Sequence, residues 1–138
     1  MRLWHYKLTP YLPKKMLVSQ WRELVAIKRQ WERGTLIHPL VSYVKDYDKS
    51  YFASYTFDIY QELLKRNINC KNIYMQEIFN FSGIEKKTKN LAYNEHDDDY
   101  LTMCYYNLKE KYVRGIISKE EWLLLDNYYN NNKYGKKE

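Results

Sequence analysis

The chain has 138 residues, enough for one domain with its own hydrophobic core, and 23 Lys and Arg against 17 Asp and Glu give a net charge of +6. This basic balance favours an acidic partner such as nucleic acid, although an AT-rich genome produces the same excess of lysine, asparagine and tyrosine. Two cysteines exclude a disulfide scaffold, and no apolar run is long enough for a signal peptide or a membrane helix, so we expect a soluble cytoplasmic protein.

The first helix is expected to begin after Pro13, a residue that suits the first helical turn, and to end near Arg33, before Gly34. Apolar residues recur along this segment at helical spacing and predict one buried stripe. The stripe consists of Leu17, Trp21, Leu24 and Trp31.

Charged side chains occupy other faces of the same helix. Glu23 has two small neighbours on the helix surface, Ser19 and Ala26, so its own helix leaves the carboxylate accessible. Basic residues spaced seven apart share a different face, which is either a solvated surface or a surface that binds phosphates. This basic face consists of Lys15, Arg22 and Arg29.

The middle of the chain contains a second predicted helix between two irregular segments. Residues 34–47 are expected to form a loop with an extended piece at 40–44, and residues 68–95 are expected to be irregular. The second helix is predicted from about Asp48 to Asn67, where asparagine suits a helix end. Its buried stripe is predicted to be Phe52, Tyr55, Ile59 and Leu63.

Two further helices are predicted in the last third of the chain. The third begins at Asp97, within a run of aspartates that suits the positive end of a helix dipole, and ends before Gly115. Ser118 and Glu121 form a capping-box pattern, which predicts a short fourth helix to about Tyr128.

These elements predict the all-α class. We expect one domain over residues 1–138, a compact bundle of three main helices plus a short fourth, with a flexible tail at 130–138. His5 and His96 are expected to be structural, although the nearness of His5 to the N-terminus leaves a role at the site open.

Residues 16–24 carry a motif that resembles a known family. Their pattern, apolar-x-x-x-aromatic-Arg-Glu-Leu, is similar to the first-helix motif of the pyrimidine-dimer DNA glycosylases of the phage endonuclease V type. The opening of the chain is similar to a bacterial branch of that family. The other stretches that resemble it are residues 1–8, 62–67, 93–96, 107–111 and 133–136.

This resemblance implies a compact all-α enzyme that acts on damaged or abasic double-stranded DNA. In such enzymes the N-terminal α-amine attacks the sugar C1′ and expels the base. The resulting imine permits β-elimination, which breaks the bond to the 3′ phosphate, so the enzyme combines glycosylase and abasic-site lyase activities. No metal ion or other cofactor is implied, and we expect a monomer.

The resemblance also implies roles for particular residues. An α-amine titrates at roughly 7.7–8.0 and a lysine amine near 10.4, so the terminus is the more available neutral nucleophile. Met1 is the expected nucleophile, because the large Arg2 should prevent removal of the initiator methionine, and Glu23 is expected to support sugar opening and proton transfer. The residues expected to contact DNA are Arg2, Lys15, Arg22, Arg29, Lys111 and Tyr134.

Three positions depart from the family pattern and support other hypotheses. Arg2 replaces a small residue, while Ala26 and Asn107 stand where the family has arginines. A non-catalytic nucleic-acid-binding protein, or a phage-type inhibitor, on the same scaffold is therefore the alternative. A protein-binding domain whose basic face meets an acidic partner is a third hypothesis.

Overall fold

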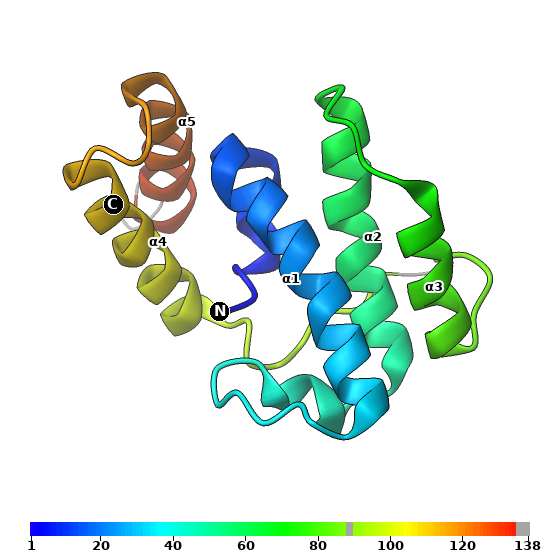
Figure 1. The fold of residues 1–138 in the computed structure, drawn as a ribbon. Coiled ribbons are helices and arrows are strands. Elements are labelled where there is room, and N and C mark those ends of the chain that lie inside the picture. Colours follow the sequence, from blue (N-terminus) through cyan, green and yellow to red (C-terminus); the bar gives the residue numbers. More distant parts are fainter. Residues whose placement is uncertain (88–89, 135–138) are drawn as a thin grey trace.

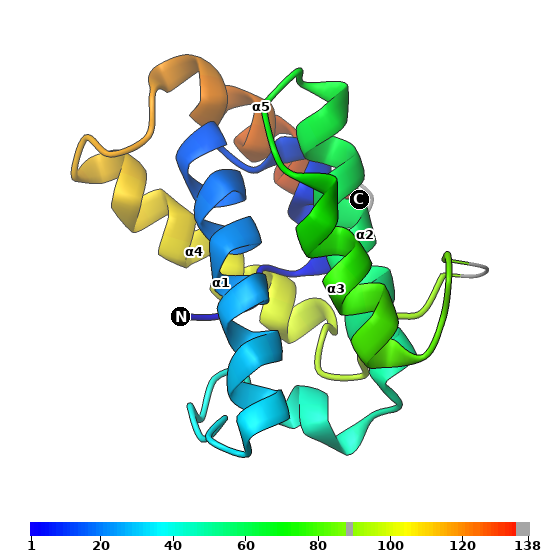
Figure 2. The same cartoon turned by 45° about the vertical axis from the view of Figure 1, so that its right-hand side comes forward.

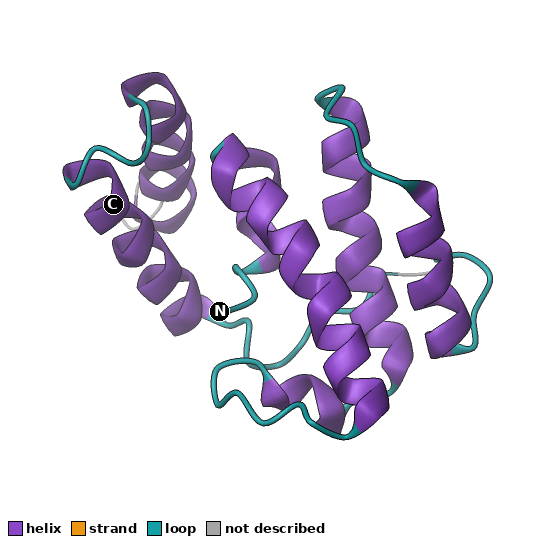
Figure 3. Ribbon diagram, viewed as in Figure 1, coloured by secondary structure: helices purple, strands orange, loops and turns teal. Residues whose placement is uncertain are grey.

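The structure is a computed structural model that describes residues 1–87 and 90–134, without the side chains of residues 133 and 134. The described residues form helices and loops and contain no strand (Figure 3), which confirms the predicted all-α class. None of the helices in these ranges is long and apolar enough to cross a membrane. The elements are the 3-10 helices η1 (Tyr6–Tyr11) and η2 (Ser42–Asp46), the helices α1 (Lys14–Arg33), α2 (Lys49–Lys65), α3 (Asn72–Ser82), α4 (Asp98–Val113) and α5 (Lys119–Tyr129), and a π-helical turn η3 (Asn130–Tyr134).

Local capping explains why the ends of most helices were predictable. Gly34 ends α1 with a φ of 75°, and Asn67 follows α2 with a φ of 58°, left-handed conformations that favour these two residue types. The side chain of Asp97 accepts a hydrogen bond from the backbone of Tyr100 at the start of α4. Each of these signals lies within a few residues of the end that it marks.

Two predictions for the middle of the chain were wrong. Residues 68–95 are not wholly irregular, because they contain α3, and the piece expected to be extended at 40–44 largely belongs to the 3-10 helix η2. No side chain caps the start of α3, and the helix has only 11 residues, although Gly83 ends it with a φ of 73°. Its apolar residues Met75, Ile78 and Phe79 are buried, mainly through packing on α2, which stabilises α3 once the chain is folded.

The N-terminal segment lies between two groups of helices (Figures 1 and 2). Helices α1, α2 and α3 pack side by side, while α4 and α5 form a hairpin on the other side of the N-terminal segment. The 3-10 helix η1 contacts both α2 and α5 and thereby joins the two groups. Leu3, Trp4 and His5 are thus buried in the interior of the fold.

The predicted apolar stripes form the core. All of the predicted α2 stripe is buried, as are Leu17, Trp21 and Leu24 of α1, while Trp31 is partly buried against the core. Tyr129, at the end of α5, is also buried and stacks on Tyr105 with 3.8 Å between ring centroids. It contributes to the core and is not available to DNA.

His5 and His96 lie buried in the aromatic interior, as expected for structural residues. His96 accepts a hydrogen bond at Nδ1 from the backbone of Tyr6 (3.3 Å), and its Nε2 lies 2.8 Å from the hydroxyl of Tyr43. Burial lowers the pKa of His96 to about 3, helped by the neighbouring His5, and burial lowers the pKa of His5 to about 4. Both side chains are therefore neutral in the folded protein at pH 7.

We expect acidification to destabilise the fold through these histidines. A histidine of the unfolded chain takes up its proton near pH 6.5, but the folded protein resists it until about pH 4 for His5 and about pH 3 for His96. The stability they contribute is present above pH 6.5 and is lost as the pH falls, by about 2 kcal/mol for each group between pH 7 and 5. Denaturant unfolding of the wild type and of His96→Gln at both pH values tests this, because the variant should lose less stability on acidification. Equal losses in the two proteins would contradict the assignment.

Candidate active site

The backbone of the N-terminal segment is held by buried polar side chains. The amide of Gln20, which is fully buried in α1, donates from Nε2 to the carbonyl oxygen of Arg2 (3.0 Å) and accepts at Oε1 from the backbone N–H of Trp4 (2.8 Å). The hydroxyl of Tyr55 in α2 donates to the carbonyl oxygen of Trp4 (2.6 Å) and lies 2.9 Å from Oε1 of Gln20. These contacts fix residues 2–4 and hence the direction in which Met1 leaves the core.

A third helix adds to this anchoring. The hydroxyl of Tyr100 in α4 donates to the carbonyl oxygen of Leu3. The Arg2 guanidinium lies over the ring of Trp4, with 5.9 Å to its centroid. Burial raises the pKa values of Tyr100 and Cys104, and the nearby Arg2 opposes both shifts, which places its guanidinium beside α4. The segment is therefore tied to α1, α2 and α4 together.

A pocket of about 290 Å³ contains Met1 in its lining and is bounded by residues of α1 and α4. Three parts of the chain contribute to it: the N-terminal segment, one face of α1 and one face of α4. The lining residues are Met1, Arg2, Trp4, Met16, Ser19, Glu23, Asn107 and Lys111. An α-amine, a carboxyl group and other cationic side chains thus share one small space.

Glu23 is half-buried in this pocket, next to the exposed Ser19 that was expected to leave it accessible. Burial raises the pKa of Glu23 above its ordinary value, because the charged form loses water. The α-amine of Met1, His38 and Lys111 act in the opposite direction, since positive charge favours the carboxylate. A half-buried carboxyl group whose pKa is raised is a candidate for general acid–base catalysis.

The structure brings together four of the residues predicted to act at the site, Met1, Arg2, Glu23 and Lys111. It places Lys15, Arg22 and Arg29 outside the lining of this pocket. Lys15 is exposed in the first turn of α1. The side chain of Tyr134 lies outside the described part of the structure.

Arg22 and Arg29 line a second groove, of about 410 Å³, between α1 and the start of α3, together with Trp21, Lys71 and Tyr74. Arg22 is exposed there. This groove shares none of its lining residues with the pocket around Met1. On α1, the face with Arg22 and Arg29 therefore lies toward α3, whereas the face with Glu23 lies toward the N-terminal segment and α4.

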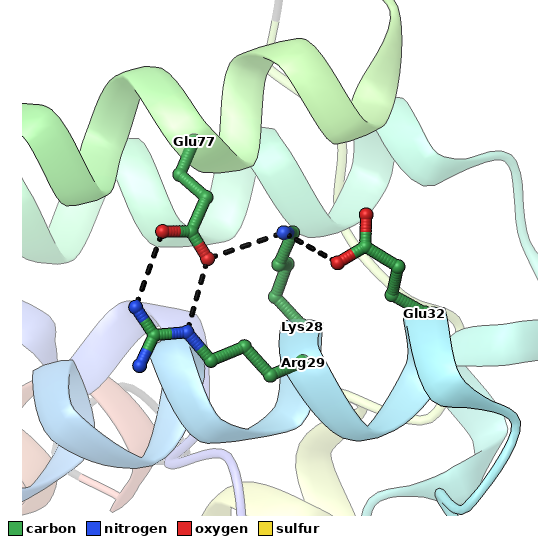
Figure 4. Close-up of polar contacts among 4 residues, drawn as sticks. All are labelled: Lys28, Arg29, Glu32 and Glu77. Carbon is green, nitrogen blue, oxygen red and sulfur yellow. Dashed lines mark hydrogen bonds and ion pairs between the residues drawn. The ribbon is translucent and has the colours of Figure 1, made fainter.

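Arg29 is engaged in an ion-pair network with α3 (Figure 4). Its Nε and one terminal nitrogen donate to the two carboxylate oxygens of Glu77 at 3.1 and 3.2 Å. The buried Lys28 donates to Glu77 (3.1 Å) and to Glu32 (2.8 Å). The hydrogen bond from Arg29 is the main reason why the pKa of Glu77 is lowered. Arg29 therefore joins two helices, a role that the sequence did not indicate.

Gln20, Tyr55 and Tyr100 are the residues that sequence reasoning missed. Tyr55 was predicted only as part of a buried apolar stripe, and no hydrogen bond was predicted for its hydroxyl. A signal was available for Gln20, because it lies one position before Trp21 of the buried stripe, and a buried amide requires hydrogen-bond partners.

The fold and this pocket define a small helical protein in which Met1 and a half-buried carboxyl group share one pocket with basic side chains. In the comparison with protein families, the model described as pyrimidine dimer DNA glycosylase matches residues 1–75 of the 138-residue chain. Since this is more than half of the chain, the protein belongs to the pyrimidine dimer DNA glycosylase family and is, at that level, a DNA repair glycosylase. Neither the curated proteins nor the solved structures contain a match to it.

The matched region includes Met1, Arg2 and Glu23 but ends before α4. Lys111 and Asn107 are therefore assigned to the site only because they line the same pocket as the matched residues.

Proposed function

We propose that this protein is a combined glycosylase and abasic-site lyase that acts on damaged duplex DNA through the α-amine of Met1. The neutral amine forms a bond to the sugar C1′, and the bond from C1′ to the base breaks, with its electron pair leaving on the base. Ring opening then gives an imine between Met1 and the sugar. Loss of a proton from C2′ breaks the C3′–O bond to the 3′ phosphate, and water finally releases the enzyme.

The observation that carries this proposal is the shared pocket of Met1 and Glu23 in a chain of the glycosylase family. Glu23 would donate a proton as the sugar ring opens and accept one during elimination, and its raised pKa suits both directions. Lys111 and Arg2 line the same pocket and would hold the phosphates beside the target sugar. Because C1′ is shielded in a stacked duplex, the target nucleotide must be rotated out of the stack.

Borohydride trapping tests the proposal directly. Incubation of the full-length protein with abasic duplex DNA and borohydride should reduce the imine to a stable covalent adduct, seen as a shifted band on a denaturing gel. A protein that binds the DNA but gives no adduct and no strand cleavage would instead be a non-catalytic binding protein.

We further propose that Arg2, Lys15, Arg22, Arg29, Lys111 and Tyr134 contact the DNA. If about three to five of the basic side chains neutralise phosphates, log K should fall with log salt with a slope of about −3 to −4.5. Arg22→Ala should reduce the magnitude of this slope by about 0.9, because the exposed Arg22 is not committed to the ion-pair network of Figure 4. Fluorescence anisotropy with labelled duplex DNA at several salt concentrations measures it.

Arg29→Ala is the matched comparison for Arg22→Ala. Glu77 already neutralises part of the charge of Arg29, so the contact of Arg29 with DNA should contribute less to the slope than that of Arg22. Arg29→Ala should also remove the ion pair between α1 and α3. A wild-type slope near zero would mean that the basic residues do not bind phosphates.

A further inference from the structure

The loop between α1 and η2 exposes apolar side chains at its tip. Leu36 and Val41, at the two ends of the tip, are buried in the core. Between them Ile37 is 83% exposed and Leu40 is 47% exposed. The ammonium of Lys45 donates to the carbonyl oxygen of Leu36 (2.6 Å) and holds the base of the loop. Two large apolar side chains are thus presented to solvent between buried anchors.

Hydrogen bonds within the tip give it a defined shape. The carbonyl oxygen of His38 accepts from the backbone N–H groups of Val41 (3.1 Å) and Ser42 (2.9 Å). The Nδ1 of His38 accepts from the backbone N–H of Leu40 (3.2 Å). Since the loop satisfies these polar groups internally, Ile37 and Leu40 are held outward by a structured turn.

This loop lies next to the candidate active site. His38 is near enough to Glu23 for its charge to affect that carboxyl group. Both views place the loop on the same side of the molecule as the N-terminus (Figures 1 and 2). On α4, the exposed Met103 precedes Asn107 by one helical turn on the face that reaches the pocket, which extends the apolar surface around the site.

We propose that Ile37 and Leu40 form an apolar wedge that enters the DNA base stack beside the nucleotide held in the Met1 pocket. This inference rests on the proposed function, because only an enzyme that must reach C1′ needs to separate stacked bases. Proteins that kink DNA insert isoleucine and leucine side chains between base steps, and the insertion offsets part of the unstacking free energy. A wedge held by a structured turn loses little conformational entropy on insertion.

The wedge predicts a defect that depends on the base stack. The double variant Ile37→Ser/Leu40→Ser should form the borohydride adduct with abasic duplex DNA more slowly, on the order of tenfold, which corresponds to about 1.4 kcal/mol. With single-stranded abasic DNA of the same sequence it should react like the wild type, because no duplex has to be opened. Ile37→Leu should retain the duplex rate. Ile73→Ser is the matched control, since Ile73 is 68% exposed on α3, away from the N-terminus.

A second readout does not require catalysis. A 2-aminopurine base placed beside the abasic site should become brighter when the wild type binds and unstacks it, and the double variant should bind without this increase. Two outcomes would overturn the wedge. In the first, the double variant forms the adduct more slowly by the same factor on duplex and on single-stranded DNA. In the second, its rate is unchanged on both DNAs and it raises the 2-aminopurine fluorescence as much as the wild type does. An equal loss would indicate that the tip contacts a sugar or a phosphate. If the wild type forms no adduct with either DNA, the proposed chemistry fails, and the fluorescence alone decides whether the loop opens the stack.

Discussion

A protein whose N-terminal amine is blocked should form no borohydride adduct and should leave abasic DNA uncut. An amide nitrogen is not nucleophilic, so acetylation or an N-terminal tag removes the group that forms the imine. In the wild type, mass spectrometry should locate the DNA on the peptide that begins with Met1. A protein with the same tag at the C-terminus controls for the size of the added group and should still form the adduct and cut the DNA.

Lys111 is the amine that could be mistaken for the terminus, because it lines the same pocket. Lys111→Arg keeps the positive charge but removes the primary amine, so this variant should still form the adduct. If Lys111→Arg lost the adduct while the N-terminally blocked protein retained it, the nucleophile would be Lys111 and our assignment of Met1 would be wrong.

Replacement of Glu23 by glutamine should slow strand cleavage by about 10²–10⁴-fold while DNA binding persists. Glutamine has nearly the same shape but cannot give or take a proton, and the pocket loses its carboxyl group among Met1, Arg2 and Lys111. Single-turnover cleavage of abasic duplex DNA measures the rate, and anisotropy measures the binding. Glu120→Gln, on the exposed first turn of α5, is the matched control and should behave as the wild type. Cleavage by Glu23→Gln at the wild-type rate would show that Glu23 is only a structural residue.

The anchored N-terminal segment gives both predictions their physical basis. A free chain terminus is normally mobile, and a mobile amine would seldom be aligned with the sugar and the carboxyl group. Here Gln20, Tyr55 and Tyr100 hold the backbone of residues 2–4, so only Met1 projects from the fixed segment. Much of the ordering of Met1, the proposed nucleophile, is thereby completed during folding.

Much of the fold could be predicted because its signals are local. The ends of α1, α2, α4 and α5 are marked by glycine, asparagine, aspartate and serine within a turn of each end, and the apolar stripes repeat at helical spacing. Helix α3 was missed because it is short and no side chain caps its start, although Gly83 ends it and Met75, Ile78 and Phe79 recur at helical spacing. Its packing is mainly on α2 and α1.

The sequence by itself determined the helical class, the Arg22-Glu23-Leu24 motif and the family, all of which depend on local spacing or on residues close in the chain. Only the tertiary structure assigned the neighbours of each charge. Arg22 and Glu23 are adjacent in sequence, yet they line different hollows, because successive residues of an α-helix are rotated by about 100°. The pocket of Glu23 is completed by Met1 and Lys111, from opposite ends of the chain. Their approach depends on buried hydrogen bonds and on helix packing, which act between distant segments and exist only in the folded protein.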